Sequence, residues 1–282
     1  MTDAPPKRGA GWVTVRVSAV GDRASVAAAM FAAGAMGVEE TRDGFVTHAP
    51  SQVDANAIVH AVVAASSGAR AETEPMPDVD WSEQWKRGIR AQAVGGLTIA
   101  PPWLRAGLDP ECTIVIEPAM AFGTGEHATT RGVVRLLQRI IIPGDRVADL
   151  GAGSAVLAIA AAKLGAGRVA AIEIDHDAIE NAELNVAANG VGDRVSVIEG
   201  DAATLLPLVA PVRVITANII SSVLLELLPL FPLALEEHGC AILSGILADE
   251  RSDMVRAVDD AGWRIDAEDA EDIWWSATIV RP

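Results

Sequence analysis

The sequence lacks the long apolar runs of a membrane protein and the apolar core of a secretion signal. No stretch of about twenty residues is free of charged side chains, and the first nine residues are polar with two prolines. Cysteines are also scarce, since only Cys112 and Cys240 occur, both among apolar, strand-like neighbours. These deficits favour a cytoplasmic protein without membrane spans, in which both cysteines are buried free thiols rather than a disulfide or a redox pair.

Basic residues are in short supply, with 22 lysines and arginines against 38 aspartates and glutamates and a net charge of −16. A protein that holds a phosphate backbone needs a basic face, so we expect no direct binding of nucleic acid. The acidic excess suits a basic partner or a cationic ligand, although it could serve solubility alone. It is unevenly spread: 6 basic and 8 acidic residues precede residue 75, whereas 16 basic and 30 acidic residues follow.

Residues 1–74 have the pattern of a small domain in which strands and helices alternate. The order βαββαβ is that of a ferredoxin-like, or split βαβ, arrangement. The only histidines in this part, His48 and His60, stand alone and indicate no catalytic role. We therefore expect a substrate-recognition domain with these elements: a strand at 12–18, a helix at 22–36, paired strands within 38–49, a helix at 53–65 and a strand at 69–74.

A segment of prolines and acidic residues begins at residue 75 and is expected to connect this domain to the rest of the chain. We assign residues 75–92 to a linker with a short helix, in which Trp81 and Trp85 fall on one face. Packing of these tryptophans at the domain junction is a simpler expectation than stacking on a cofactor.

Residues 93–282 alternate strands and helices, which predicts a doubly wound, Rossmann-like sheet that is mostly parallel. The first long helix is expected to run to Ile140 with Thr129 or Thr130 as its cap. The chain ends on two successive strands, which suggests an antiparallel hairpin at one edge. The seven expected strands are 147–150, 168–173, 194–198, 212–216, 240–243, 263–266 and 273–280, and a helix is expected at 222–235.

The most informative segment, residues 147–175, is typical of a strand, a glycine turn, a helix and a second strand that ends in an acid. Gly151 and Gly153 leave room for a nucleoside ligand at the N-terminus of the helix. The carboxylate of Glu173 can accept two ribose hydroxyls, and Asp175 is the alternative if the strand runs further. This pattern alone suits a nicotinamide dehydrogenase as well as an S-adenosylmethionine enzyme.

Two further positions concern the same ligand. Ala155 stands where a third glycine often closes such turns, so the motif is weakened although alanine is small. Asp201 follows the strand at 194–198 and falls where an adenine amino group is often bound in sheets of this kind. We include Asp201 in the expected binding site on that basis.

An asparagine after a later strand separates the two enzyme classes. Asn218 ends the apolar strand that begins at Val212, at the carboxyl edge where ligands bind in open parallel sheets. A buried asparagine needs hydrogen-bond partners, and its oxygen can accept N–H bonds from an amine and aim the lone pair. A dehydrogenase has no need of this group, so Asn218 favours methyl transfer to an amine. The alternative is that Asn218 caps the following helix.

With these residues in place, the chain resembles the bacterial ribosomal protein L11 methyltransferases, the PrmA family. The Phe-Gly-Thr-Gly-x-His-x-Thr-Thr pattern is highly specific for that family. Glu173 stands where the family usually has aspartate and Ile220 where it has leucine, and both changes are conservative. The similarity is carried by the turn at Gly151 and by Asp80-Trp81 to Trp85-Lys86, Ala121-Phe122-Gly123-Thr124-Gly125-Glu126-His127-Ala128-Thr129-Thr130 and Ala217-Asn218-Ile219.

The resemblance implies an S-adenosylmethionine-dependent N-methyltransferase that modifies lysine side chains and the α-amino group of ribosomal protein L11. Asn218 is the expected catalytic residue, which orients the amine, while His127 is expected to structure its loop. No metal is expected. The expected cofactor-binding positions are Thr130, Gly151, Glu173 and Asn218 by resemblance, Phe122 as a shield of the sulfonium, and Gly153 and Asp201 from the sheet pattern.

The resemblance also implies that residues 1–74 grip the basic L11 substrate, and we expect the protein to be a cytoplasmic monomer. Three alternatives stay open at this point. They are a lysine methyltransferase for another protein, such as the flavoprotein-directed relatives, a nicotinamide dehydrogenase, and a non-catalytic binding protein that has kept the fold. The identity of the modified lysines and their degree of methylation are also left open by the sequence.

Overall fold

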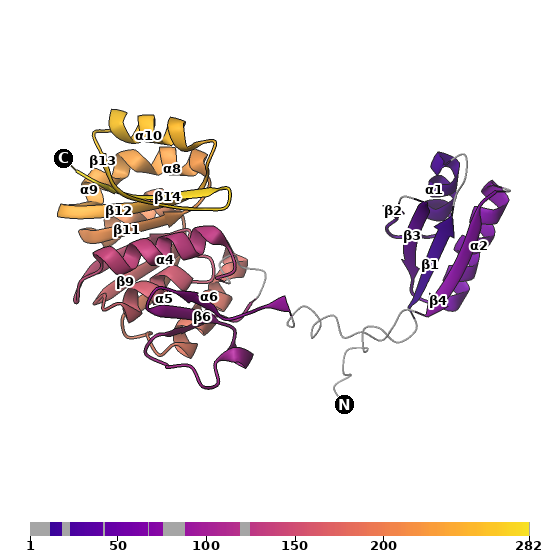
Figure 1. The fold of residues 1–282 in the computed structure, drawn as a ribbon, viewed down its shortest axis with the longest axis horizontal. Coiled ribbons are helices and arrows are strands. Elements are labelled where there is room, and N and C mark those ends of the chain that lie inside the picture. Colours follow the sequence, from indigo (N-terminus) through magenta and orange to yellow (C-terminus); the bar gives the residue numbers. More distant parts are fainter. Residues whose placement is uncertain are drawn as a thin grey trace. The chain divides into compact units, whose positions relative to one another are not determined.

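Figure 1 shows the computed structural model of the protein, which describes residues 12–18, 23–41, 43–66, 68–75, 88–118 and 125–281. Trp81, Trp85 and Phe122, to which the sequence assigns roles, lie outside the described residues. The chain divides into two compact units, Met1–Gly88 and Ile89–Pro282, and each is considered by itself. No helix among the described residues has the length and apolar character that a membrane crossing requires.

The first unit is an antiparallel sheet with the strand order β2-β3-β1-β4 and two helices packed on it. Because side chains alternate along a strand, Val13, Val15 and Val17 point to one face, where they form a core with Met30 and Ile58 of the helices. Its elements are β1 (Val13–Ser18), α1 (Arg23–Ala32), β2 (Glu39–Thr41), β3 (Gly44–Ala49), α2 (Gln52–Ala65) and β4 (Arg70–Pro75).

The second unit is built on a mixed sheet with the strand order β10-β9-β8-β11-β12-β14-β13. The strands from β10 to β12 pair in parallel, whereas β14 pairs antiparallel with both β12 and β13. The strands are β8 (Arg146–Leu150), β9 (Arg168–Glu173), β10 (Val195–Glu199), β11 (Val212–Asn218), β12 (Leu235–Leu247), β13 (Arg264–Glu271) and β14 (Trp274–Val280). The expected C-terminal hairpin is present as β13 and β14.

Helices cover both faces of this sheet (Figure 1), and each face has its own apolar core. One core contains α4, α5 and α6, and the other contains α7 to α10. The helices are α4 (Ala128–Ile140), α5 (Val156–Lys163), α6 (His176–Ala188), α7 (Ala202–Val209), α8 (Ser221–Leu227), α9 (Phe231–Ala234) and α10 (Arg251–Asp260). A small sheet of β5 (Gln92–Val94), β6 (Leu97–Ala100) and β7 (Thr113–Val115) precedes α4.

The strand order places a switch point at β8. From β8 the chain adds β9 and β10 on one side and then returns to add β11 and β12 on the other. In open sheets of this type, ligands bind in the crevice at the carboxyl ends of the strands beside such a point. The turn after Leu150 and the residues after Ala217 follow the carboxyl ends of the neighbouring strands β8 and β11, so the fold brings the two main sequence motifs to one edge.

One predicted helix, 222–235, is wrong in its extent. The structure breaks it into α8, a 3₁₀ turn at Leu228–Leu230 and α9, and β12 then begins at Leu235. Pro229 and Pro232 explain the break, since proline lacks the amide that a helix interior needs and its ring clashes with the preceding turn.

The prediction of two buried thiols is correct for only one of them. Cys240 lies within β12 and is 4% exposed, and burial raises the pKa of its thiol to about 11. Cys112 is exposed, because it belongs to the turn that precedes β7 rather than to the strand itself. Apolar neighbours in sequence therefore did not place Cys112 in the core.

Candidate active site

The glycine turn between β8 and α5 is held against the end of β9. The amides of Gly151 and Ala152 both donate to the carbonyl of Ile172, at 2.9 and 3.0 Å. Gly151 has a φ of +70°, and a Cβ at this position would lie 2.5 Å from Cγ2 of Ile219. Since Ile219 follows Asn218, the absence of a side chain at Gly151 lets the ends of β8 and β11 approach each other.

Ala155, where the sequence lacks a third glycine, adopts the left-handed conformation that glycine would favour. Its φ is 64°, it stands at the N-terminal end of α5, and it is fully buried. A residue with a Cβ is strained there by roughly 1–2 kcal/mol. The substitution thus carries a backbone cost in addition to its effect on the closure of the turn.

Glu173 lies at the carboxyl end of β9 and faces the glycine turn. One carboxylate oxygen accepts a hydrogen bond from the amide of Gly153 at 2.7 Å, and the other accepts one from the amide of Asp175 at 2.9 Å. The side chain of Asp175 instead caps α6 by accepting a bond from the amide of Asp177 at 3.0 Å. Of the two acids that the sequence offered, Glu173 is therefore the one that borders the turn.

Asp149 lies beneath the same turn and was not singled out by the sequence analysis. Its carboxylate is fully buried and accepts hydrogen bonds from the hydroxyl of Thr216 at 2.7 Å and from the amide of Ala158 at 3.1 Å. Burial raises the pKa of Asp149 to about 6, and the charge of Glu173 adds to the effect. An acid within the apolar run Val147–Leu150 was the signal that could have indicated it.

This pKa predicts a pH-dependent stability. Because the pKa of Asp149 rises from 3.8 to about 6 on folding, the native state holds a proton that the unfolded state has lost between those values. The unfolding free energy should therefore fall as pH rises through that window, by about 3 kcal/mol for this group. In Asp149→Asn this loss should be absent. Between pH 4 and pH 7 the unfolding free energy of the variant, measured with urea, should therefore rise by about that amount relative to that of the wild type.

The exposed Asp249→Asn provides the control for that experiment, since it also replaces one aspartate by asparagine but does so at the protein surface. A constant difference between Asp149→Asn and the wild type over the same range would show that Asp149 keeps an ordinary pKa.

Asn218 is the last residue of β11, at the carboxyl edge of the sheet, and it borders a cavity of about 230 Å³. No hydrogen bond links its side chain to any other residue that the structure describes. The alternative role as a helix cap is wrong, because Ile220 occupies the cap position of α8 without a side-chain bond. We call this space the Asn218 cavity; it is lined by His127, Thr129, Asn218, Ile219, Ile220, Gly245 and Trp274.

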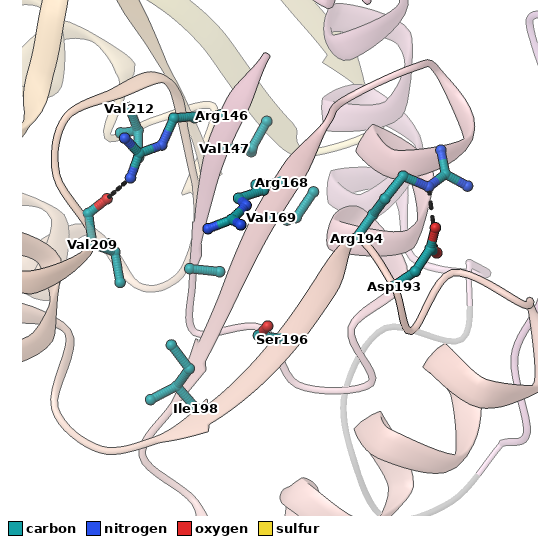
Figure 2. A pocket seen from close by; sticks show the side chains of 11 residues that line it. Arg146, Val147, Arg168, Val169, Asp193, Arg194, Ser196, Ile198, Val209 and Val212 are labelled. Atoms are coloured by element: carbon teal, nitrogen blue, oxygen red, sulfur yellow. Dashed lines mark hydrogen bonds and ion pairs between the residues drawn. The ribbon is translucent and has the colours of Figure 1, made fainter. Parts of the chain in front are cut away.

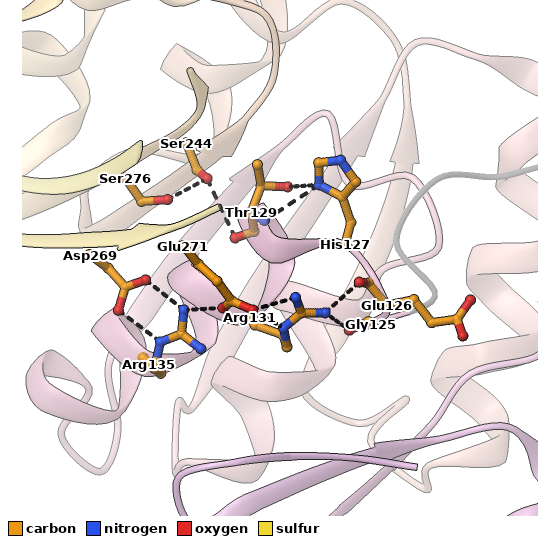
Figure 3. Close-up of polar contacts among 10 residues, drawn as sticks. All are labelled: Gly125, Glu126, His127, Thr129, Arg131, Arg135, Ser244, Asp269, Glu271 and Ser276. Carbon is orange, nitrogen blue, oxygen red and sulfur yellow. Dashed lines mark hydrogen bonds and ion pairs between the residues drawn. The ribbon is translucent and has the colours of Figure 1, made fainter. Parts of the chain in front are cut away.

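Two rings from distant parts of the chain form one side of the Asn218 cavity. His127 precedes α4 and meets Trp274, the first residue of β14, with ring centroids 4.8 Å apart and an interplanar angle of 63°. His127 also caps α4, because its Nδ1 accepts a bond from the amide of Thr129 at 3.4 Å (Figure 3). The predicted cap at Thr129 or Thr130 is therefore wrong, and the loop-structuring role of His127 is confirmed.

The pKa of His127 is lowered, chiefly by burial and further by the positive charge of Arg131. The ring is accordingly neutral at pH 7. Trp274 was missed by the sequence analysis, since nothing in its local sequence relates it to His127. Its position depends on the insertion of β14 beside β12.

Thr130 is fully buried in the first turn of α4, and its Oγ1 has no hydrogen-bond partner among the described residues. An unpaired buried hydroxyl costs about 1–3 kcal/mol, and folded proteins rarely leave one. Thr130 follows Thr129, which lines the Asn218 cavity, so its hydroxyl is suited to a polar atom of a ligand bound there.

Asp201 follows β10 and has a structural role in the protein. It caps α7, where its carboxylate accepts bonds from the amide and the hydroxyl of Thr204 at 2.9 and 2.8 Å. These bonds lower the pKa of Asp201. The side chain is exposed, so it is open to solvent in addition to serving as a cap.

A second hollow, of about 380 Å³, lies at the opposite edge of the sheet (Figure 2). It includes the first residues of β8 and β9, and Arg146 there donates a hydrogen bond to the carbonyl of Val209 at 3.0 Å. None of the predicted site residues lines it. The carboxyl edge, with the glycine turn, Glu173 and the Asn218 cavity, is therefore the candidate active site.

Comparison with known proteins agrees with this geometry. Residues 20–282 match the family described as "Ribosomal protein L11 methyltransferase (PrmA)". The ribosomal protein L11 methyltransferase of Thermus thermophilus is 41% identical over 202 residues, which cover 71% of this chain and 77% of the relative. That of Desulfitobacterium hafniense is 40% identical over 198 residues, 70% of this chain and 62% of the relative.

A solved structure shows the same fold. The crystal structure of ribosomal protein L11 methylase from Lactobacillus delbrueckii subsp. bulgaricus superposes with a TM-score of 0.62 at 31% sequence identity, and the match covers 68% of this chain and 99% of that chain. The large mixed sheet is thus that of an α/β Rossmann-like methyltransferase, and the chain belongs to the ribosomal protein L11 methyltransferase family.

Proposed function

We propose that this protein is an S-adenosylmethionine-dependent N-methyltransferase that modifies lysine side chains and the N-terminal amine of ribosomal protein L11. The observation that carries the proposal is the position of Asn218 at the carboxyl edge of β11, facing a cavity with no carboxylate among its described lining residues. Membership of the family and the names of the relatives support the choice of substrate.

The residues at the switch point fit S-adenosylmethionine. Gly151 has no room for a side chain, Glu173 offers a carboxylate to ribose hydroxyls, and the buried Oγ1 of Thr130 lacks a partner among the described residues. We assign Thr130, Gly151, Gly153, Glu173 and Asn218 to the cofactor site, together with the exposed Asp201, and Phe122 as a shield of the sulfonium. When bound, S-adenosylmethionine supplies a methyl group carried on a positively charged sulfur.

Asn218 is suited to a neutral amine. A lysine amine, with a reference pKa of about 10.4, must lose a proton before its lone pair can attack. The apolar lining of Ile219 and Ile220 lowers the pKa of the amine by desolvation, whereas a carboxylate would raise it. The Asn218 oxygen can accept an N–H bond and orient the lone pair without favouring the cation. Alignment of this kind is worth about 7–11 kcal/mol at best.

The first unit supports the assignment of a basic protein substrate. Its strand order and its βαββαβ sequence support a ferredoxin-like domain, and its two helices share the core of Val13, Val15 and Val17. On the strand positions of the other face, Glu39 and Glu72 are exposed and negative, whereas Glu74 pairs with Arg16 at 2.8 Å. We therefore propose residues 1–74 as the substrate-recognition domain, 75–92 as the linker and 93–282 as the seven-stranded methyltransferase domain.

We further propose that the enzyme acts as a cytoplasmic monomer and makes no direct contact with nucleic acid, in keeping with its net charge of −16.

Intact mass spectrometry of purified L11, incubated with this protein and S-adenosylmethionine, tests the proposal. Mass increases in steps of about 14 Da would establish both the reaction and the substrate. If L11 keeps its mass while calorimetry shows S-adenosylmethionine bound, the assignment of L11 as the substrate is refuted and the cofactor assignment stands. If L11 keeps its mass and S-adenosylmethionine does not bind, the proposal is wrong.

The glycine turn gives a separate prediction for cofactor binding. In Gly151→Ala, the positive φ and the contact with Ile219 should together weaken S-adenosylmethionine binding about tenfold or more, measured by calorimetry. Gly144→Ala is the matched control, because Gly144 also has a positive φ but has open space around it and lies outside the site. Equal affinities of the two variants would show that the turn does not hold the cofactor.

A further inference from the structure

We propose that Arg131 and Glu271 form a bridge that positions the two rings of the Asn218 cavity and thereby keeps the amine aligned for methyl transfer. The inference rests on the proposed function. His127 belongs to the segment before α4, whereas Trp274 begins β14, so their contact requires two segments that are distant in the sequence to be held together.

Arg131 contacts both segments at once (Figure 3). Its Nη1 donates to the carbonyls of Gly125, at 3.4 Å, and Glu126, which directly precede His127. Its Nε and Nη2 donate to Oε1 of Glu271, the Nε bond being 3.0 Å long. Glu271 is the last residue of β13, immediately before the turn that leads to Trp274. One guanidinium therefore joins the backbone beside one ring to the hairpin that carries the other.

The bridge is partly withdrawn from water, which distinguishes it from ordinary surface ion pairs. The side chains of Arg131 and Glu271 are 15% and 30% exposed, whereas those of Arg256 and Asp253 are 75% and 74% exposed. The hydrogen bond from Arg131 lowers the pKa of Glu271, so the pair is charged at neutral pH. Charge-assisted bonds in such surroundings are short and directional, as the fixing of a cavity wall requires.

The next turn of α4 provides a built-in comparison. Arg135 bonds to Asp269 at 2.7 and 2.6 Å and to the second oxygen of Glu271 at 2.6 Å. It joins the same helix to the same strand, but none of its hydrogen bonds to the described residues reaches Gly125 or Glu126. Arg135 thus joins only α4 to β13. Arg131 joins the same two elements and also bonds to the backbone that precedes His127.

The inference predicts a division between kcat and KM. In Arg131→Gln, kcat for L11 methylation should fall about tenfold or more because the amine is no longer aligned. The KM for L11 and the Kd for S-adenosylmethionine should stay within about threefold, since Arg131 neither lines the Asn218 cavity nor belongs to the residues assigned to the cofactor site. Arg131→Lys should recover part of kcat, because an ammonium can bond to Glu271 or to the carbonyls but does not match the fork of a guanidinium.

Arg135→Gln is the control for these measurements. It should lower the melting temperature about as much as Arg131→Gln does, yet keep kcat within about twofold. Equal losses of kcat in the two variants would assign the whole network to stability and overturn the proposal. A loss in Arg131→Gln that lies in cofactor affinity instead of kcat would overturn it as well.

A second measurement needs no substrate and therefore separates this inference from the proposed function. The pKa of His127 is lowered by burial and by Arg131, so NMR titration of the ring should show a higher pKa in Arg131→Gln and no change in Arg135→Gln. Contacts between the rings of His127 and Trp274 should weaken only in the first variant. If the wild type fails to methylate L11, the proposed function is wrong; if the two rings stay in place without Arg131, the bridge is wrong.

Discussion

Replacing Asn218 with alanine should lower kcat for L11 methylation about a hundredfold or more and leave the Kd for S-adenosylmethionine within about tenfold. Alanine keeps the strand and the apolar cavity but removes the oxygen that orients the amine. The amine then enters the Asn218 cavity without a hydrogen bond that aims its lone pair at the methyl group. Single-turnover kinetics and calorimetry would measure the two effects separately.

Asn218→Asp sharpens this test, because the side chain keeps its shape and gains a charge. A carboxylate stabilises the ammonium form of the substrate and raises its pKa, so activity at pH 7 should be low and should recover partly near pH 9. Alanine should show no such recovery. Loss of kcat and of cofactor affinity to the same degree in both variants would exclude an amine-orienting role and leave Asn218 as a cofactor contact alone.

Removing residues 1–77 should abolish methylation of intact L11 and spare the binding of S-adenosylmethionine. The second unit has its own apolar cores on the two faces of its sheet, and the predicted cofactor residues all belong to it. The first unit contributes no residue to that site in this assignment, and its exposed Glu39 and Glu72 suit a basic protein. Calorimetry would measure the binding of S-adenosylmethionine, and the intact mass of L11 would show whether it is methylated.

A double substitution in the full-length chain controls for loss of stability caused by the truncation. Glu39→Gln combined with Glu72→Gln leaves the fold of the first unit in place and removes two exposed charges, one from β2 and one from β4. This variant should raise the KM for L11 and make it less sensitive to salt, while kcat stays nearly unchanged. Methylation of intact L11 by the truncated protein at the wild-type rate would refute the division of labour between the units.

The position of several candidate site residues in the fold could be predicted because they lie at the ends of strands that the local sequence specifies. The strand at 147–150 runs directly into Gly151, and the strand before Asn218 ends at that residue, so the rule that ligands bind at carboxyl ends places both motifs on one edge. Glu173 and Asp175 were equally plausible from the sequence. The structure separates them, because the cap of α6 occupies Asp175.

Other features had no local signal. Trp274 reaches His127 only because β14 pairs with β12, and Arg131 reaches Glu271 across 140 positions of sequence. The lack of a hydrogen-bond partner at the Thr130 hydroxyl also depends on how α4 packs, since the same threonine at the surface would bond to water. Nothing in the local sequence indicates that these residues belong to the site and their neighbours do not.

The sequence by itself therefore determined the alternation of strands and helices, the glycine turn, the asparagine that ends β11 and the acidic surface. These follow from periodicity, from backbone freedom and from charge, which act over a few residues or over the whole composition. Only the tertiary structure decided that the rings of His127 and Trp274 meet at the Asn218 cavity and that Arg131 and Glu271 lie beside them. It also decided that Cys112 is exposed while Cys240 is buried. The physical reason is that side chains on different strands become neighbours through long-range pairing, and no local pattern specifies that partner.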